Sequence, residues 1–356
     1  MPTVTRSRRA DEVIDIRDLT KSGDLSPVAL FVYRRPAHLR RTLETLRANP
    51  EAPQTELFVF CDNARDASTA GGVDAVRKLL LEGDLGFAAT HIVLRDSNYG
   101  LARNITEGVS QVLQVRETVI VVEDDITVSP FFLRFMNEAL GCYKDNPTVG
   151  SISGYCYPVT EPVPETYFIR GADCWGWATW RDRWQVFSPD GPALLRELKA
   201  RNLCHAFDFD GAMGFVQMLK DQIAGRNDSW AVRWHASCYL RDMLILYPGR
   251  ALAHNIGHDG SGTHSLQEDD SFNVMLSPTA IAVGGIEVAE NVQAREAICR
   301  FFRKEPPSAA DEPAANRAPS TGALAPARLQ KTLRRLLARY LPLGIVNVLR
   351  AIRSRL

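Results

Sequence analysis

Short apolar runs alternate with amphipathic stretches along the first part of the chain. Runs at residues 27–33, 57–61, 92–94 and 118–122 predict strands, and each is followed by a helical pattern of apolar residues. The run at 118–122 has no polar alternation, which is typical of a parallel strand covered on both faces. Regular alternation of strand and helix predicts an α/β fold with a mainly parallel central sheet and right-handed crossovers.

The pattern changes after a fifth predicted strand at residues 149–155. Helical stretches follow at 193–201 and 207–223, and the Gly- and His-rich segment 251–264 is typical of a loop. All the tryptophans lie in this half, at positions 175, 177, 180, 184, 230 and 234. We expect four of the six in the core, because an indole buries a large apolar area.

Charge is balanced overall but not along the chain. The 356 residues contain 42 Lys and Arg against 42 Asp and Glu, so no basic surplus indicates a nucleic-acid partner. From Pro313 onward there are nine basic residues and no acidic one, which leaves 33 basic against 42 acidic residues before it. This tail has helical periodicity, so it either lies on an anionic membrane surface or packs on the protein or a partner.

The cysteines and the N-terminus indicate a cytoplasmic protein. Seven scattered cysteines without a CxxC pair favour reduced thiols over a disulfide framework or a zinc site. The charged N-terminus has no apolar segment of a signal peptide, and no stretch approaches the roughly 20 apolar residues of a spanning helix. We therefore expect a cytoplasmic protein that attaches to the inner face of the membrane, if at all, through its tail.

Three acids close the fourth predicted strand: Glu123, Asp124 and Asp125. Ligands of open α/β sheets bind outside the carboxyl ends of the strands. Carboxylates held so close together repel one another unless a cation or hydrogen bonds keep them ionised, and Mg²⁺ or Mn²⁺ suits such hard oxygen ligands. The alternative is a solvated turn whose acids cap a helix beginning near Ser129.

Four groups of segments together resemble a known enzyme family. They are FVYRRPAHLRRTLETL; FCDNARDAS; SNYGLARNITEGV followed by VIVVEDDITVSPFFLRFMNEAL; and WGWATWRDRW with NDSWAVRW and NIGHDGSGTH. Over residues 26–265 the chain resembles the inverting GT-A glycosyltransferases, in particular the bacterial family 2-like enzymes. It is more distantly similar to the animal N-acetylglucosaminyltransferase I family.

The resemblance implies one nucleotide-binding α/β domain of GT-A type. The implied division of the chain is an N-terminal extension (1–25), a catalytic domain (26–300) with a donor-binding half (26–150) and an acceptor half (151–300), a Pro/Ala-rich linker (305–327) and a basic amphipathic helical tail (328–356).

The resemblance also assigns roles to the three acids. Asp125 would bind the Mn²⁺ or Mg²⁺ that bridges the diphosphate of the donor, Asp124 would approach the ribose, and Glu123 would support the site. A fixed dication stabilises the negative charge that develops on a diphosphate leaving group.

Other candidate donor-binding residues follow the first three strands: Arg34, Arg35, Asp62, Asn98 and Arg103. By resemblance Asp62 contacts the nucleotide base, and an arginine contacts base or phosphate. Each has a structural alternative, because Asp62 is also typical of a turn and the arginines of a solvated surface. Asn98 and Arg103 flank a helix start, where they bind diphosphate or cap the helix.

Inverting transfer needs a base that deprotonates the acceptor hydroxyl. The resemblance favours Asp228 in NDSWAVRW, and its alternative is a loop Asp that caps a helix starting at Trp230. The competing candidates are Asp173, Asp182 and Asp190.

Acceptor and loop residues complete the implied site. Gly176 and Trp177 are the acceptor-binding candidates. His258 and His264 lie in a loop that folds over the donor in similar enzymes, where one of them would touch the metal or the diphosphate.

The implied function is metal-dependent transfer of a sugar from a nucleoside diphosphate sugar, UDP first, to a saccharide or lipid-linked acceptor in polysaccharide or glycolipid biosynthesis. Two alternatives stay open: a sugar-phosphate nucleotidyltransferase, and an inactive sugar-binding or scaffold protein of the same fold.

Overall fold

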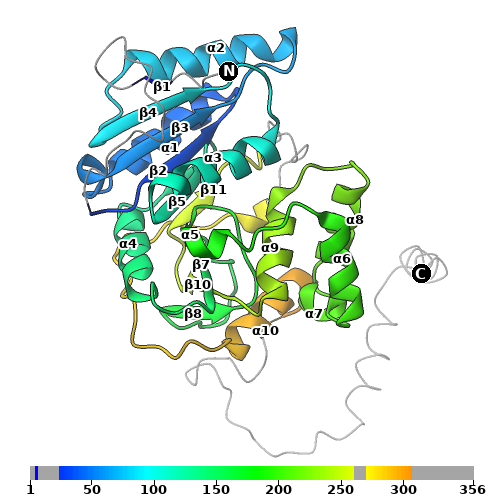
Figure 1. Cartoon of the computed structure of the whole chain (residues 1–356). Coiled ribbons are helices and arrows are strands. Elements are labelled where there is room, and N and C mark those ends of the chain that lie inside the picture. Colours follow the sequence, from blue (N-terminus) through cyan, green and yellow to red (C-terminus); the bar gives the residue numbers. More distant parts are fainter. Residues whose placement is uncertain (1–4, 7–23, 260–269, 307–356) are drawn as a thin grey trace, which may run out of the picture. The chain divides into compact units, whose positions relative to one another are not determined.

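The structure, a computed structural model, describes residues 5–6, 24–259 and 270–306 (Figure 1). The predicted basic tail, nearly all of the predicted linker and His264 therefore lie outside the described residues. Among the helices that are described, none combines the length and the apolarity needed to cross a bilayer.

A nine-stranded mixed sheet forms the centre of the fold, in the order β1-β4-β3-β2-β5-β9-β7-β10-β8. The strands are β1 (Thr5–Arg6), β2 (Val28–Val32), β3 (Glu56–Cys61), β4 (Ala89–Leu94), β5 (Thr118–Glu123), β7 (Val149–Ser153), β8 (Thr166–Ile169), β9 (Trp177–Trp180) and β10 (Leu244–Pro248). Six of these run in one direction, while β1, β8 and β9 are antiparallel to their neighbours. The prediction of an α/β fold with a mainly parallel sheet is confirmed.

Helices cover both faces of this sheet (Figure 1). They are α1 (Pro36–Arg47), α2 (Ala67–Glu82), α3 (Leu101–Val115), α4 (Phe132–Cys142), α5 (Arg181–Trp184), α6 (Gly191–Ala200), α7 (Cys204–Phe207), α8 (Phe215–Ile223), α9 (Trp230–Leu240) and α10 (Val292–Arg303), with 3-10 turns at Ala52–Gln54 and Asp270–Phe272. Apolar residues of α1, α2 and α4 pack on one face, and those of α3, α9 and α10 on the other.

Burial on two faces explains why the strands lack polar alternation. In β2, Leu30 belongs to the apolar cluster on one face, and Ala29 and Phe31 belong to the cluster on the other. Helix α3 approaches β2 so closely that a Cβ on Gly108 would lie 2.5 Å from the Phe31 ring. Only glycine fits at this crossing, which fixes the position of α3 over the sheet.

The strand order places a topological switch point between β2 and β5. From β2 the chain moves outward to β3 and β4, and it then returns to add β5 on the opposite side of β2. Crevices at such points, outside the carboxyl ends of the strands, are where open α/β sheets bind ligands. The residues after β2 and the three acids at the end of β5 therefore meet at one place.

A small second sheet follows the acids. Strand β6 (Ile126–Val128) pairs antiparallel with β11 (Ala253–Asn255), within a segment predicted to be loop. Helix α4 begins later, at Phe132, and the Ser129 hydroxyl accepts from the Phe131 N–H at 3.2 Å. The three acids thus precede a strand and do not cap this helix.

The predicted helix over residues 207–223 is wrong in its first half. The structure instead has α7, a turn and then α8, with Phe209 and Asp210 at positive φ. The Asp208 carboxylate accepts the Val216 N–H at 2.7 Å, so it satisfies a donor at the start of α8. Side-chain competition for backbone donors of this kind interrupts helices.

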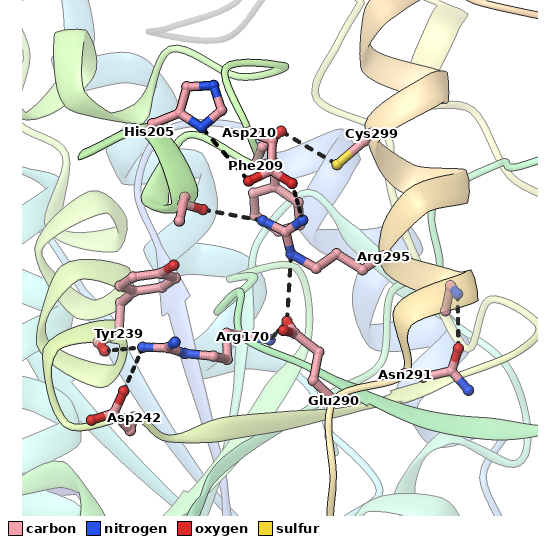
Figure 2. A network of polar contacts seen from close by, with 12 residues as sticks. Arg170, His205, Phe209, Asp210, Tyr239, Asp242, Glu290, Asn291, Arg295 and Cys299 are labelled. Carbon is pink, nitrogen blue, oxygen red and sulfur yellow. Dashed lines mark hydrogen bonds and ion pairs between the residues drawn. The ribbon is translucent and has the colours of Figure 1, made fainter. Parts of the chain in front are cut away.

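Helix α10 is held by the polar network shown in Figure 2. Arg295 pairs with Asp210 and lies 3.6 Å from Glu290, and the Glu290 carboxylate accepts the Arg170 N–H at 2.9 Å. Asn291 caps the helix by accepting from the Ala294 N–H at 2.8 Å. Helix α10 and the two residues before it thus contact the residue that follows β8 and the turn after α7.

One buried ion pair at the amino end of β3 offers a stability test. Arg116 donates from Nε and Nη2 to the two oxygens of Glu56, at 2.7 and 2.9 Å, and both side chains are almost fully buried. Arg116→Met should reduce the free energy of unfolding in urea by about 3–5 kcal/mol, because it leaves a buried carboxylate without its cation.

The matched control is Arg134→Met, which removes the exposed pair of Arg134 with Glu138 at 2.8 Å. That change should cost less than about 1 kcal/mol. Equal losses in the two variants would contradict a special role for the buried pair.

Candidate functional site

Asp124 is enclosed by the segment that follows β2. The residue is 5% exposed, and its Oδ2 accepts the Tyr33 N–H at 3.1 Å. The Thr42 hydroxyl on α1 donates to the Asp124 carbonyl at 2.8 Å. Asp124 is therefore positioned by backbone and helix contacts from the neighbouring strand connection.

Arg35 joins two of the three acids. Its Nη2 donates to Asp124 Oδ1 at 2.7 Å and to Asp125 Oδ2 at 2.6 Å. Burial opposes the guanidinium charge, but the two carboxylates outweigh it and raise the pKa of Arg35 above its usual range. Its Nη1 is buried and has no hydrogen-bond partner among the described residues.

Glu123 differs from its two neighbours. Burial raises the pKa of its carboxyl to about 8, the charges of Asp125 and Asp124 add to the shift, and Arg35 opposes it. No hydrogen bond to its side chain is present in the described part of the chain. Burial thus favours the protonated form of Glu123, whereas Arg35 pairs with Asp124 and Asp125.

The segment after β11 covers Asp125. The Ile256 N–H donates to the Asp125 carbonyl at 2.8 Å, and a Cβ on Gly257 would lie 2.2 Å from Asp125 Oδ2 and 3.0 Å from Arg35 Nη1. Glycine is thus required for this close approach. The next residue, His258, packs edge-on against the Trp175 ring at 5.2 Å, which places it beside the acids.

Asp62 organises the turn before α3. It is 4% exposed and accepts from the N–H groups of Tyr99 (2.8 Å) and Gly100 (3.0 Å) and from Asn98 Nδ2 (3.1 Å). Burial raises the pKa of this carboxyl, and the backbone N–H donors oppose the shift. The structure therefore gives Asp62 and Asn98 a turn-forming role.

Asp228 reaches the same turn from the other half of the chain. Its side chain is exposed, and Oδ2 accepts the Ala102 N–H at 3.2 Å in the first turn of α3. The cap of α9 is the neighbouring Ser229, which accepts the Val232 N–H. Asp228 thus does not cap the helix that starts at Trp230, and it lies with Asp62 around the N-terminus of α3.

The other predicted arginines are engaged nearby. Arg103 is exposed, donates to Glu107 at 2.7 Å and lies over the Tyr99 ring at 3.8 Å. Arg34 is half-buried, with its guanidinium 5.8 Å from the centre of the Tyr33 ring.

The predicted acceptor residues are packed inside the protein. Trp177 is fully buried and stacks on Trp230 at 5.5 Å, and a Cβ on Gly176 would lie 2.9 Å from Ala253. Of the six tryptophans, which all lie in the described part of the chain, Trp175 is partly exposed and the other five are buried. Five tryptophans rather than four are therefore buried, and the partly exposed Trp175 packs against the rings of Tyr155, His258 and Phe272.

The segment before β9 carries a further partly buried carboxylate, Asp173. Asp173 accepts from the Tyr157 hydroxyl at 2.9 Å and from the Trp175 N–H at 3.0 Å, and burial raises its pKa. Burial also raises the pKa of the Cys174 thiol, and the charges of Asp173, Glu123 and Asp125 add to that shift. Asp173 is thus held by Tyr157 and by the backbone of Trp175, in the half of the chain that carries the tryptophans.

The two remaining candidates for the base have structural partners. Asp182 pairs with Arg183 at 2.5 Å, and Asp190 caps α6 by accepting from the Ala193 N–H at 2.8 Å.

The donor set fits a divalent ion that is shared with a substrate. Within the described residues no three His, Cys, Asp or Glu side chains are arranged to hold a metal by themselves. Mg²⁺ and comparable ions, however, are commonly bound by one or two carboxylates together with substrate phosphates and water. Asp125 Oδ1, which has no partner in the described part of the chain, can supply such a ligand.

Comparisons with known proteins add little to this geometry. No family model matches the chain, and no curated protein matches it. Among solved structures, the crystal structure of S. aureus TarS aligns with 40% of this chain and 24% of its own, at 15% sequence identity and a TM-score of 0.28. The chain thus spans about a quarter of that structure, and a likeness this partial carries no argument. The strand order defines an α/β protein whose candidate ligand site is the switch point between β2 and β5, where the three acids lie.

The role of Asp62 in the turn can be tested directly. Asp62→Ala should lower the free energy of unfolding by about 2 kcal/mol, because it removes a buried acceptor of several hydrogen bonds. Hydrogen exchange at the amides of Tyr99 and Gly100 should accelerate. Asp66→Ala, which removes the exposed cap of α2, is the control and should leave both amides unchanged. Unaltered exchange in the Asp62 variant would contradict the assignment.

Proposed function

We propose that this protein is a glycosyltransferase that moves a sugar from a nucleoside diphosphate, UDP first, to a hydroxyl of a saccharide or lipid-linked acceptor with inversion. The observation that carries the proposal is the meeting of Arg35, Asp124 and Asp125 at the switch point of the sheet. An anionic ligand with a divalent ion matches this combination of one guanidinium and several carboxylates.

The residues around the switch point would divide the donor between them. Asp125 would hold Mn²⁺ or Mg²⁺, and the ion, when bound, would stabilise negative charge on the leaving diphosphate. Arg35 would offer its buried Nη1 to a phosphate oxygen, and Asp124 would lie towards the ribose. The N-terminal turn of α3, whose Tyr99, Gly100 and Ala102 N–H groups are taken by Asp62 and Asp228, would contribute the positive end of its helix dipole.

Asp228 is our candidate for the base. Its carboxylate is exposed and is oriented by a hydrogen bond from the Ala102 N–H to Oδ2, and its Oδ1 has no partner among the described residues, so this oxygen would accept the proton of an acceptor hydroxyl. Asp173 is the runner-up, because it lies in the tryptophan-rich half of the chain next to Cys174, whose thiol is affected by the charges of Asp173, Glu123 and Asp125.

A lipid-linked acceptor would agree with a tail at residues 328–356 that binds an anionic membrane surface. This segment lies outside the described residues, so the proposal rests on its eight basic residues, the absence of acidic residues in its sequence and its apolar periodicity.

A nucleotidyltransferase agrees less well with the connection after β2. Such enzymes usually carry a Gly-rich, basic phosphate loop there, but α1 begins at Pro36, directly after Tyr33, Arg34 and Arg35. A scaffold protein without catalysis would bind donor but would not turn it over.

The assay for this proposal measures what is released from UDP-, GDP- and dTDP-sugars with Mn²⁺ or Mg²⁺ and acceptor extracts. We expect nucleoside diphosphate, whereas pyrophosphate chemistry would indicate the nucleotidyltransferase. Asp125→Ala should abolish both release and metal-dependent donor binding, because the ion loses its protein ligand. Retained activity in this variant would overturn the assignment of Asp125.

The base is tested by Asp228→Asn. The amide oxygen can still accept the Ala102 N–H, so the fold and donor binding should persist while kcat falls by about 10²–10⁴-fold. Asp173→Asn is the matched variant in the acceptor half and should retain turnover if Asp228 is the base. The opposite result, lost turnover only in the Asp173 variant, would transfer the role to Asp173.

A further inference from the structure

We infer that the free protein does not take up its divalent ion alone, and that the ligand it recognises is the complex of the dication with the nucleoside diphosphate sugar. This inference rests on the proposed function and concerns the same site. Its basis is that Arg35 already occupies the position of a cation between Asp124 and Asp125.

Three of the four carboxylate oxygens at this position are engaged. Asp124 Oδ1 and Asp125 Oδ2 share the Nη2 of Arg35, at 2.7 and 2.6 Å, and Asp124 Oδ2 accepts the Tyr33 N–H at 3.1 Å. Asp125 Oδ1 is the oxygen left without a partner in the described part of the chain. A hard dication takes six or more oxygen ligands, so one such oxygen is a weak site by itself.

The surroundings keep Arg35 in place. Its side chain is 20% exposed, and Gly257 lies so close that an added Cβ would be 3.0 Å from Nη1. An ion arriving alone would have to displace a buried guanidinium from two carboxylates and would leave that guanidinium without an anion. Separating a buried ion pair in this way is strongly unfavourable.

A diphosphate would supply the anion that Arg35 lacks when an ion arrives alone. Arg35 Nη1 is buried and has no hydrogen-bond partner among the described residues, so a phosphate oxygen would satisfy a donor that the free protein leaves unpaired. Arginine binds phosphate oxygens with charge-assisted hydrogen bonds. The incoming complex therefore supplies an anion for Arg35 together with the phosphate ligands that the ion needs.

The test measures Mn²⁺ binding to the full chain by electron paramagnetic resonance and calorimetry, without activity. With Mn²⁺ alone we expect no saturable binding up to millimolar concentration. Addition of UDP should strengthen Mn²⁺ binding by at least about tenfold, as linkage between two ligands requires. Equal Mn²⁺ affinity with and without UDP would overturn the inference and leave the proposed function standing.

Failure of the proposed function gives a different result. If UDP, GDP and dTDP all fail to bind with or without Mn²⁺, the proposed function is lost, and the inference that rests on it is lost with it.

Substitution of Arg35 gives the reverse test. Arg35→Gln frees the two carboxylates, so Mn²⁺ alone should bind at least about tenfold more tightly than to the wild type. Arg35→Lys keeps one positive charge and should resemble the wild type. Arg41→Gln, at an exposed position of α1, is the control and should change nothing.

Unchanged Mn²⁺ binding in a folded Arg35→Gln variant, checked by circular dichroism, would overturn the inference. If that variant does not fold, the comparison of wild-type protein with and without UDP decides the question.

Discussion

The pairing of Arg35 with Asp124 and Asp125 is the constraint around which the site is built. Two carboxylates held this close in a largely buried position need a positive charge, and the chain supplies it from the neighbouring strand connection. The pairing requires β2 and β5 to be adjacent, α1 to begin directly after Arg35, and a glycine at position 257. The sheet order, the β2–α1 turn and the β6–β11 pair together position Arg35 against the two carboxylates.

The N-terminus of α3 is the second organising element. Asp62, from the end of β3, fixes the backbone of Tyr99 and Gly100, and Asp228, from the other half of the chain, accepts the Ala102 N–H. One helix start thus contacts both a candidate donor residue and the candidate base. The two halves are joined here by hydrogen bonds to backbone donors, which the helix end would otherwise leave unsatisfied.

Prediction from the sequence succeeded where the signal is local. The apolar runs of β2, β3, β4 and β5 and the acids at the end of β5 are visible as unbroken stretches of residues. It failed where partners are distant in the chain: β11 forms only because β6 pairs with it, and the break between α7 and α8 depends on the Asp208 side chain. Trp177 is likewise buried by Trp230, which lies far along the sequence.

The sequence by itself determined the α/β class and a cluster of acids at a strand end, because periodicity and strand boundaries depend on neighbouring residues. It also named three cationic candidates, Arg34, Arg35 and Arg103, but it could not choose between them. Only the tertiary structure decided that Arg35 spans Asp124 and Asp125, that Asp62 holds a turn, and that Trp177 is buried while Trp175 is partly exposed. The physical reason is that these outcomes depend on the order in which strands assemble and on side chains brought together from separate elements.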